Sequence, residues 1–159
     1  MIIRNMEEKD LGAVSAICMD AFLQSVAGTL SDEGNSTFSN IATCDAFRDR
    51  MKGDNSILVA ENDGQIEGVI ELKEGRHVAM LFIRPERQKK GIGSQLLASA
   101  LKHAKVDTVT VSASLSSVPA YEKYGFACKG EVGESAGLLY QPMEIKLSQT
   151  MQSAFEARA

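Results

Sequence analysis

A basic cluster stands directly in front of a glycine-containing turn. Its members are Arg84, Arg87, Lys89 and Lys90. The turn Gly91-Ile92-Gly93 follows, in a chain of 159 residues whose formal net charge is −4, so the positive charge is local. The first N–H groups of a helix lack intrahelical partners, and glycine lets a bulky ligand come close to them. A turn of this kind with lysines beside it is suited to binding phosphate.

The turn does not match the two commonest nucleotide-binding motifs. No G-x-x-x-x-G-K-[ST] run is present, and Leu96 stands where the dinucleotide fingerprint has its third glycine. A different phosphate-bearing ligand is therefore indicated. The alternative is that the lysines are solvated charges and the glycines only turn the chain, which is the usual explanation of an isolated Gly-x-Gly.

Composition limits the other function classes. With 44% hydrophobic and 24% charged residues, we expect one α+β domain over 1–147 and a C-terminal tail over 148–159. The acidic balance disfavours nucleic-acid and membrane binding, and without a long apolar run or a signal-peptide layout we expect a cytoplasmic protein. The cysteines are odd in number and widely spaced, which predicts neither a disulfide framework nor a metal site. We expect Cys18 and Cys128 to be buried.

Apolar periodicity predicts the elements that position the turn. In the first half we expect a strand over 2–4, a helix over 11–22, an irregular region over 24–40 that is a mobile loop or a frayed helix, a helix over 45–52 and a hairpin over 57–61 and 65–72. A central strand over 77–83 follows, with His77, Ala79, Leu81 and Ile83 on one face and Val78, Met80 and Phe82 on the other. Beyond it we expect a helix over 91–105, a strand over 108–112, a short helix over 118–124 and a last strand over 138–147.

Two motifs in this order resemble the GNAT family, the Gcn5-related N-acetyltransferases, and in particular an uncharacterised bacterial and archaeal branch. The run Gln88-Lys89-Lys90-Gly91-Ile92-Gly93 matches the family's Q/R-x-x-G-x-G/A pyrophosphate loop, and Tyr121-Glu122-Lys123-Tyr124-Gly125-Phe126 matches its second signature. The likeness covers 2–147. It implies a GNAT fold, a mixed, mostly antiparallel sheet with splayed middle strands and about four flanking helices.

The resemblance also implies the ligand and the residues that bind it. Acetyl-CoA would be the cosubstrate, with its diphosphate on the turn from Gln88 to Ser94. The pantetheine arm would lie between the splayed strands, bonded to the backbone of Leu81, Phe82 and Ile83. Ser114 stands where many members have an asparagine that bonds this arm, and serine can also donate a hydrogen bond there.

The resemblance implies that an amine attacks the thioester directly, and it suggests three residues for proton transfer. Tyr121 occupies the general-acid position, with a packing role as the alternative. His77 aligns with a glutamate base of the histone acetyltransferase branch, and Glu71 is a second candidate base that would act through water. The alternatives are a structural histidine and a solvated strand charge.

The sequence leaves the acceptor open. A small-molecule amine and a protein or peptide amine both fit, with contacts expected from 22–47 and from the strands near Glu71. A homodimer is common in the family. The alternative to an N-acyltransferase is a non-catalytic CoA-binding sensor or interaction module on the same fold.

Overall fold

A computed structural model describes residues 1–25 and 31–147. The N-terminal part contains β1 (Ile2–Asn5), α1 (Leu11–Ser25), α2 (Asp32–Ile41) and α3 (Cys44–Met51). The meander β2 (Asn55–Asn62), β3 (Gln65–Lys73) and β4 (His77–Ile83) follows, and then α4 (Ile92–Leu101). The chain continues through β5 (Thr108–Ala113), α5 (Val118–Lys123), β6 (Ala127–Cys128), β7 (Gly133–Ser135) and β8 (Leu138–Lys146).

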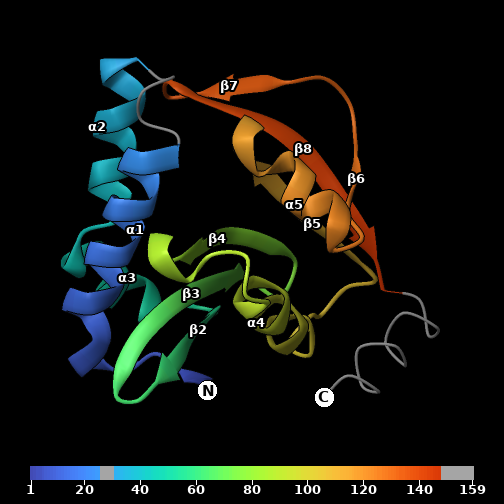
Figure 1. The fold of residues 1–159 in the computed structure, drawn as a ribbon. Helices are drawn as coiled ribbons and strands as arrows, with labels where there is room; N and C mark the ends of the chain where they lie inside the picture. The colour runs from blue at the N-terminus through green and yellow to red at the C-terminus, as the bar shows by residue number, and fades with distance from the viewer. Residues whose placement is uncertain (26–30, 148–159) are drawn as a thin grey trace.

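The strands form one twisted sheet between two layers of helices (Figure 1). Its order is β1-β2-β3-β4-β5-β8-β6, with β7 paired to β8. Every neighbouring pair is antiparallel except β4 and β5. α4 packs against one face of β2 to β4, whereas α1 packs against the other face of β3 and β4. The predicted mixed, mostly antiparallel fold is confirmed, with five α-helices in the described residues where about four were expected.

The sheet opens between its two middle strands. β4 and β5 run parallel but pair at only two positions, His77 with Thr110 and Val78 with Val111. β4 nevertheless continues to Ile83, and along that length it pairs only with β3 among the described strands. The strands therefore part after Val78, as the predicted splay requires, and backbone groups on this edge of β4 are left without a strand partner.

A β-bulge at Ala79 changes which side chains share a face of β4. Val78 pairs with Leu72 and Met80 pairs with Glu71, so Ala79 has no partner in the β3 register. Because the extra residue reverses the alternation, Val78 packs in the same core cluster as Leu81. Met80 and Phe82 pack in the other cluster. The predicted grouping of Val78 with Met80 and Phe82 is therefore wrong.

The expected irregular region over 24–40 is mostly helical where it is described. α1 continues to Ser25, and α2 begins at a cap where the Ser31 hydroxyl accepts a hydrogen bond from the Gly34 N–H at 3.2 Å. Such a serine cap, followed by Asp32 in the first turn, is a start signal that the polar composition concealed. Residues 26–30 and the predicted tail over 148–159 lie outside the described residues.

Smaller differences concern element ends and one cysteine. α4 ends at Leu101, earlier than expected, and β7 is an additional short strand. Cys18 is buried, as expected, and burial raises the pKa of its thiol to about 12. Cys128 is exposed, so the expectation of burial is wrong. It lies on β6, a two-residue strand at the end of the sheet order, where nothing covers the side chain fully.

Candidate functional site

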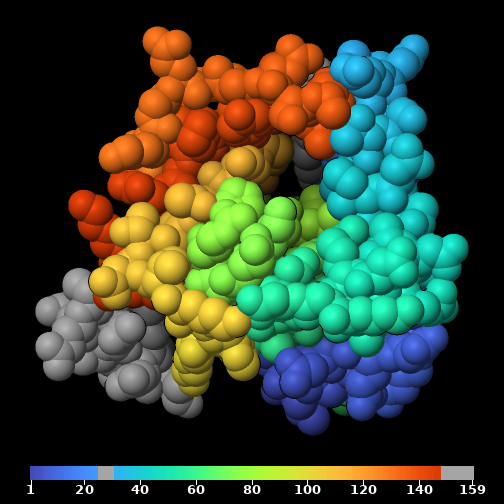
Figure 2. Space-filling view, turned by 180° about the vertical axis from the view of Figure 1, so that it is seen from behind, coloured from blue at the N-terminus to red at the C-terminus, as the bar shows by residue number. Residues whose placement is uncertain are grey.

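A cavity of about 460 Å³ lies where β4 and β5 part. One side is formed by α1 and α2, the other by β5 and the start of α5, and the segment from β7 into β8 contributes the remaining wall. Viewed from behind, the surface is hollowed between α2, β4 and the β7–β8 segment (Figure 2). The splay of the sheet thus produces a ligand-sized space that is open to solvent.

The glycine turn presents free amides beyond the end of β4. Gly91 has φ of 83° and Lys89 has φ of 64°, so the backbone turns through left-handed conformations before α4. The first helical hydrogen bond is from the Gln95 N–H to the Gly91 oxygen, at 3.1 Å. The N–H groups that precede Gln95 in α4 therefore have no intrahelical acceptor, and the positive end of the helix dipole adds to them. This geometry suits an anion.

The basic cluster divides into two parts with different roles. Arg84 donates to the Ile66 oxygen at 3.0 Å, and Arg87 Nε pairs with the buried carboxylate of Glu67 at 3.1 Å. Lys89 and Lys90 are exposed, and among the described residues no ion pair involves them. The arginines therefore hold the segment onto β3, whereas the lysines face outward beside the free amides.

Glu67 was not predicted from the sequence as part of this arrangement. Its signal was a carboxylate inside the apolar run from Ile66 to Ile70, which only a nearby cation could stabilise on burial. Arg87 supplies that cation.

Two further contacts connect the turn to the rest of the site. Gln88 Nε2 donates to the Ile83 oxygen at 3.3 Å, so the turn is bonded to the last residue of β4. Gly93 is buried beneath Tyr124. The contact is so close that a Cβ at this position would overlap the tyrosine hydroxyl. The Tyr124 ring in turn packs edge-on against Tyr121, with ring centroids 5.9 Å apart. A side chain at Gly93 would therefore disturb both the turn and Tyr121.

Tyr121 lies in the cavity wall on α5 and is buried. Its ring also packs against Phe126 at a centroid distance of 5.4 Å. Burial, with a smaller contribution from Tyr124, raises the pKa of the Tyr121 phenol above its usual value. The hydroxyl is therefore protonated throughout the neutral range, as a proton donor must be.

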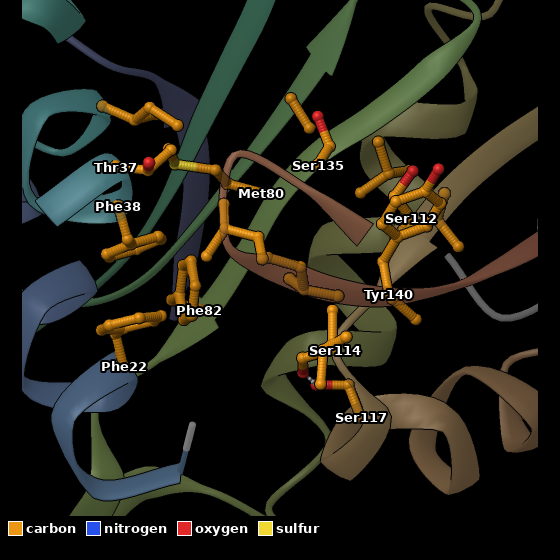
Figure 3. A pocket seen from close by; sticks show the side chains of 18 of the residues that line it. Phe22, Thr37, Phe38, Met80, Phe82, Ser112, Ser114, Ser117, Ser135 and Tyr140 are labelled. Atoms are coloured by element: carbon orange, nitrogen blue, oxygen red, sulfur yellow. Dashed lines mark hydrogen bonds between the residues drawn. The ribbon is translucent and has the colours of Figure 1, made fainter. Parts of the chain in front are cut away.

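Two serines stand beside Tyr121 in the same wall. The Ser114 and Ser117 hydroxyls are 2.6 Å apart and both line the cavity (Figure 3). Leu81 and Phe82 line it as well, from the parted segment of β4. The cavity therefore brings the predicted residues Leu81, Phe82 and Ser114 together with Tyr121. Ser117 was not predicted, because its position before a short helix indicates only a cap.

The two candidate bases lie outside the cavity lining. His77 is half-buried, and its Nδ1 is 2.7 Å from the Thr110 hydroxyl where β4 and β5 still pair. Burial, and then the charges of Arg76 and Lys73, lower the pKa of His77. The structure therefore gives this imidazole a structural contact between the two strands. No finding tests its role as a base, which stays a prediction.

Glu71 is fully buried on the opposite side of β3 from α4. Arg50 Nε donates to both of its carboxylate oxygens, at 2.8 and 3.1 Å, and Asn55 Nδ2 donates at 2.6 Å. This carboxylate is thus already bound by two side chains and connects α3 to the sheet. Its role as a base through water also stays a prediction.

The cavity wall opposite the serines is aromatic (Figure 3). Phe22 of α1 stacks on Phe38 of α2 with ring centroids 4.0 Å apart, and Phe38 meets Phe82 of β4 edge-on at 5.4 Å. These α1 and α2 residues fall in the segment over 22–47 from which acceptor contacts were expected. Their joint placement depends on α2, in a region for which the sequence left a mobile loop or a frayed helix open.

Within residues 1–25 and 31–147, no three His, Cys, Asp or Glu side chains come together as a metal site. None of the helices in that part of the chain is both long and apolar enough to cross a bilayer.

Comparison with known proteins identifies the family. The Acetyltransferase (GNAT) domain family matches residues 26–147. An uncharacterised N-acetyltransferase of Escherichia coli (strain K12), YafP, is 30% identical over 125 residues, which is 78% of this chain and 79% of that protein.

Solved structures show the same fold. A Gcn5-related N-acetyltransferase from Rhodopseudomonas palustris superposes with a TM-score of 0.80 at 23% identity, over 92% of this chain and 95% of that one. A PaiA N-acetyltransferase from Thermoplasma acidophilum, solved in complex with coenzyme A, gives 0.75 at 24% identity, over 91% and 98%. The chain therefore belongs to the GNAT family of acetyltransferases.

Proposed function

We propose that acetyl-CoA and a primary amine bind together in the cavity and that the amine attacks the thioester directly. The observation that carries this proposal is one cavity, opened by the parting of β4 and β5, with Tyr121 in its wall and the free-amide turn of α4 next along the chain from β4. A long ligand can then extend from the turn, along β4, to the phenol.

The cosubstrate would be held mainly by backbone. The amides from Lys89 to Ser94 would bind the diphosphate, with Lys89 and Lys90 adding charge, and the unpaired edge of β4 at Leu81 to Ile83 would bind the pantetheine amides. Ser114 would contribute a hydroxyl to the same arm. Because the backbone would make these hydrogen bonds, the side chains at the contact positions can be apolar, as Leu81, Phe82 and Ile83 are.

The chemical step needs one proton donor and one proton acceptor. The amine nitrogen bonds to the thioester carbon, the carbon–sulfur bond breaks, and the departing sulfur takes the phenolic proton of Tyr121. Because neither His77 nor Glu71 lines the cavity, we assign the amine proton to water. Solvent then returns a proton to Tyr121, and no covalent enzyme intermediate is needed.

Release of free thiol from acetyl-CoA across a panel of amines tests this function. Tyr121→Phe should lower turnover by roughly 100- to 10,000-fold, the usual contribution of general acid catalysis, and leave CoA affinity within about threefold. Tyr124→Phe is the matched control, because it removes a hydroxyl from a ring that packs against Tyr121 but is not among the residues lining the cavity. Unchanged turnover in Tyr121→Phe would remove the assignment.

A further inference from the structure

The acceptor end of the cavity is apolar and uncharged. Its wall is the aromatic cluster Phe22, Phe38 and Phe82, continued by Met80, Ile41 and Leu138. The polar side chains that line the cavity are hydroxyls of serine, threonine and tyrosine, including Thr37 beside Phe38. Among the described residues, no Asp, Glu, Lys, Arg or His lines the cavity. A ligand charge placed there would find dipoles and ring faces but no counter-ion.

The nearest acidic side chains along the chain are directed elsewhere. Glu134 precedes the lining residue Ser135 on β7, but it is exposed and is not among the residues that line the cavity. Asp32 and Glu33 lie in the first turn of α2, where they complement the helix dipole at its exposed start. Neither group contributes a carboxylate to the lining.

The same wall is closed by a direct contact between α2 and the β7–β8 turn. The Thr37 hydroxyl donates to the Ala136 oxygen at 2.7 Å, and a Cβ at Gly137 would overlap the backbone of Gly34. Both segments line the cavity next to this contact. This contact closes one side of the cavity beside the aromatic cluster, so a group that packs against the rings loses part of its hydration.

These features discriminate between classes of amine. The amine that reacts must be neutral when it attacks, and ring faces can hold its ammonium form before that through cation–π attraction. A second ammonium on the same ligand would have to be desolvated without a carboxylate partner, which is unfavourable. An aromatic or branched apolar group would instead bury surface against the three rings.

We propose that the acceptor is a monoamine whose amino group is carried on an aromatic or apolar group, and that polyamines and other polycations are disfavoured. This inference rests on the proposed acetyl transfer and adds the substrate class. The proposed substrate class follows from the side chains that line the cavity of this chain. The fold shared with other family members does not determine those side chains.

Two pairs of amines test the proposal with the full-length protein. 1-Aminopentane and 1,5-diaminopentane have the same five-carbon chain and differ only in the second amino group, which is charged at neutral pH. We expect kcat/KM, measured by thiol release, to be at least about tenfold higher for the monoamine. 2-Phenylethylamine should exceed ethylamine by at least about 100-fold, because the ring adds several buried carbons.

A charge-introducing variant gives the matched test. Ser135 is exposed at the rim of the cavity and belongs to no part of the proposed catalytic machinery. Ser135→Asp should raise the ratio of diamine to monoamine kcat/KM by at least about tenfold and leave the KM for acetyl-CoA unchanged. Ser135→Asn is its uncharged control and should leave the ratio as in the wild type.

Equilibrium binding separates this inference from the proposed function. Calorimetry of each amine against the CoA-loaded protein reports amine preference without turnover. Preferential binding of the monoamine supports the inference even if no thiol is released, a result that would overturn only the proposed reaction. Equal or tighter binding and faster turnover of 1,5-diaminopentane in the wild type would overturn the inference and leave acetyl transfer standing.

Discussion

Replacement of Glu71 by glutamine separates a buried structural ion pair from a general base. The side chain is fully buried, the single Arg50 Nε–H is shared between its two carboxylate oxygens, and Asn55 donates one further hydrogen bond. Glutamine has the same shape, but its NH₂ group must face one of these donors. The change therefore removes a charge pair and at least one hydrogen bond without creating a cavity.

The expected loss of stability follows from this geometry. Removal of one partner of a buried pair costs roughly 3–5 kcal/mol, because the other charge is left uncompensated. The Arg50 side chain is 25% exposed, so water can reach part of the guanidinium and the lower end, about 3 kcal/mol, applies. For a domain of this size that is a fall in Tm of roughly 6–12 °C.

The assay combines thermal unfolding with kinetics well below Tm. We expect Glu71→Gln to lower Tm as stated, with kcat/KM within about threefold of the wild type and an unchanged pH–rate profile. Glu8→Gln is the control, because Glu8 pairs with Arg48 at the surface and should leave Tm unchanged. In the double variant Arg50→Gln/Glu71→Gln, the loss should be smaller than the sum of the single losses.

The reverse result would refute this reasoning. If turnover fell by about 100-fold or more, with Tm unchanged and the acidic limb of the pH–rate profile lost, Glu71 would be the base. The assignment of the amine proton to water would then be wrong.

Three further variants follow from the geometry. Gly93→Val should weaken CoA binding by at least about tenfold in calorimetry, because the valine side chain would displace Tyr124. Gly91→Asn should weaken CoA binding less, because a Cβ at Gly91 meets no neighbour and asparagine tolerates a positive φ. Asp10→Asn should be less stable than the wild type near neutral pH. The Arg4 guanidinium holds the pKa of Asp10 below its usual value. The stabilisation from the Asp10 carboxylate is therefore present above that usual pKa and is lost as pH falls through the lowered pKa of the folded state. The curves of Tm against pH for Asp10→Asn and the wild type should then converge in acid. His77→Gln should reduce the dependence of Tm on pH between about 7 and 5, because burial lowers the pKa of His77 and the stabilisation from its neutral form is lost as pH falls through that lowered pKa.

Outcomes that contradict these three predictions are equally specific. Equal CoA affinity in Gly93→Val and the wild type would show that the turn does not need this close approach. A difference in Tm between Asp10→Asn and the wild type that stays constant down to acid pH would show that the carboxylate charge of Asp10 does not stabilise the folded protein. A pH–Tm curve of His77→Gln that overlies the wild type would assign the acid sensitivity to other groups.

The motifs with strict backbone requirements were predictable from the sequence. Gly91 has a positive φ of 83°, a conformation that favours glycine, so the Gly-x-Gly run together with the lysines before it indicates the anion site. Apolar runs bounded by turn residues such as Asp63 and Gly64 likewise predict β2, β3 and β4. These features depend on local chain geometry, which neighbouring residues report directly.

The features that depend on long-range contacts were not predictable. The bulge at Ala79 is set by the pairing of β4 with β3, and the sequence of β4, an apolar run from Val78 to Ile83, gives no sign of it. α2 was concealed by polar residues, because it buries Phe38 against two other elements and exposes most of its surface. The burial of Glu71 depends on Arg50, twenty-one residues away in the chain. The aromatic wall of the cavity depends on α2 in the same way.

The central claim is that main-chain amides at the start of α4 bind the diphosphate of coenzyme A. A crystal structure of the protein with CoA tests it most directly. We expect diphosphate oxygens within hydrogen-bond distance of amides between Lys89 and Ser94, with the pantetheine arm between β4 and β5. A diphosphate bound elsewhere, with those amides contacting only water, would contradict it.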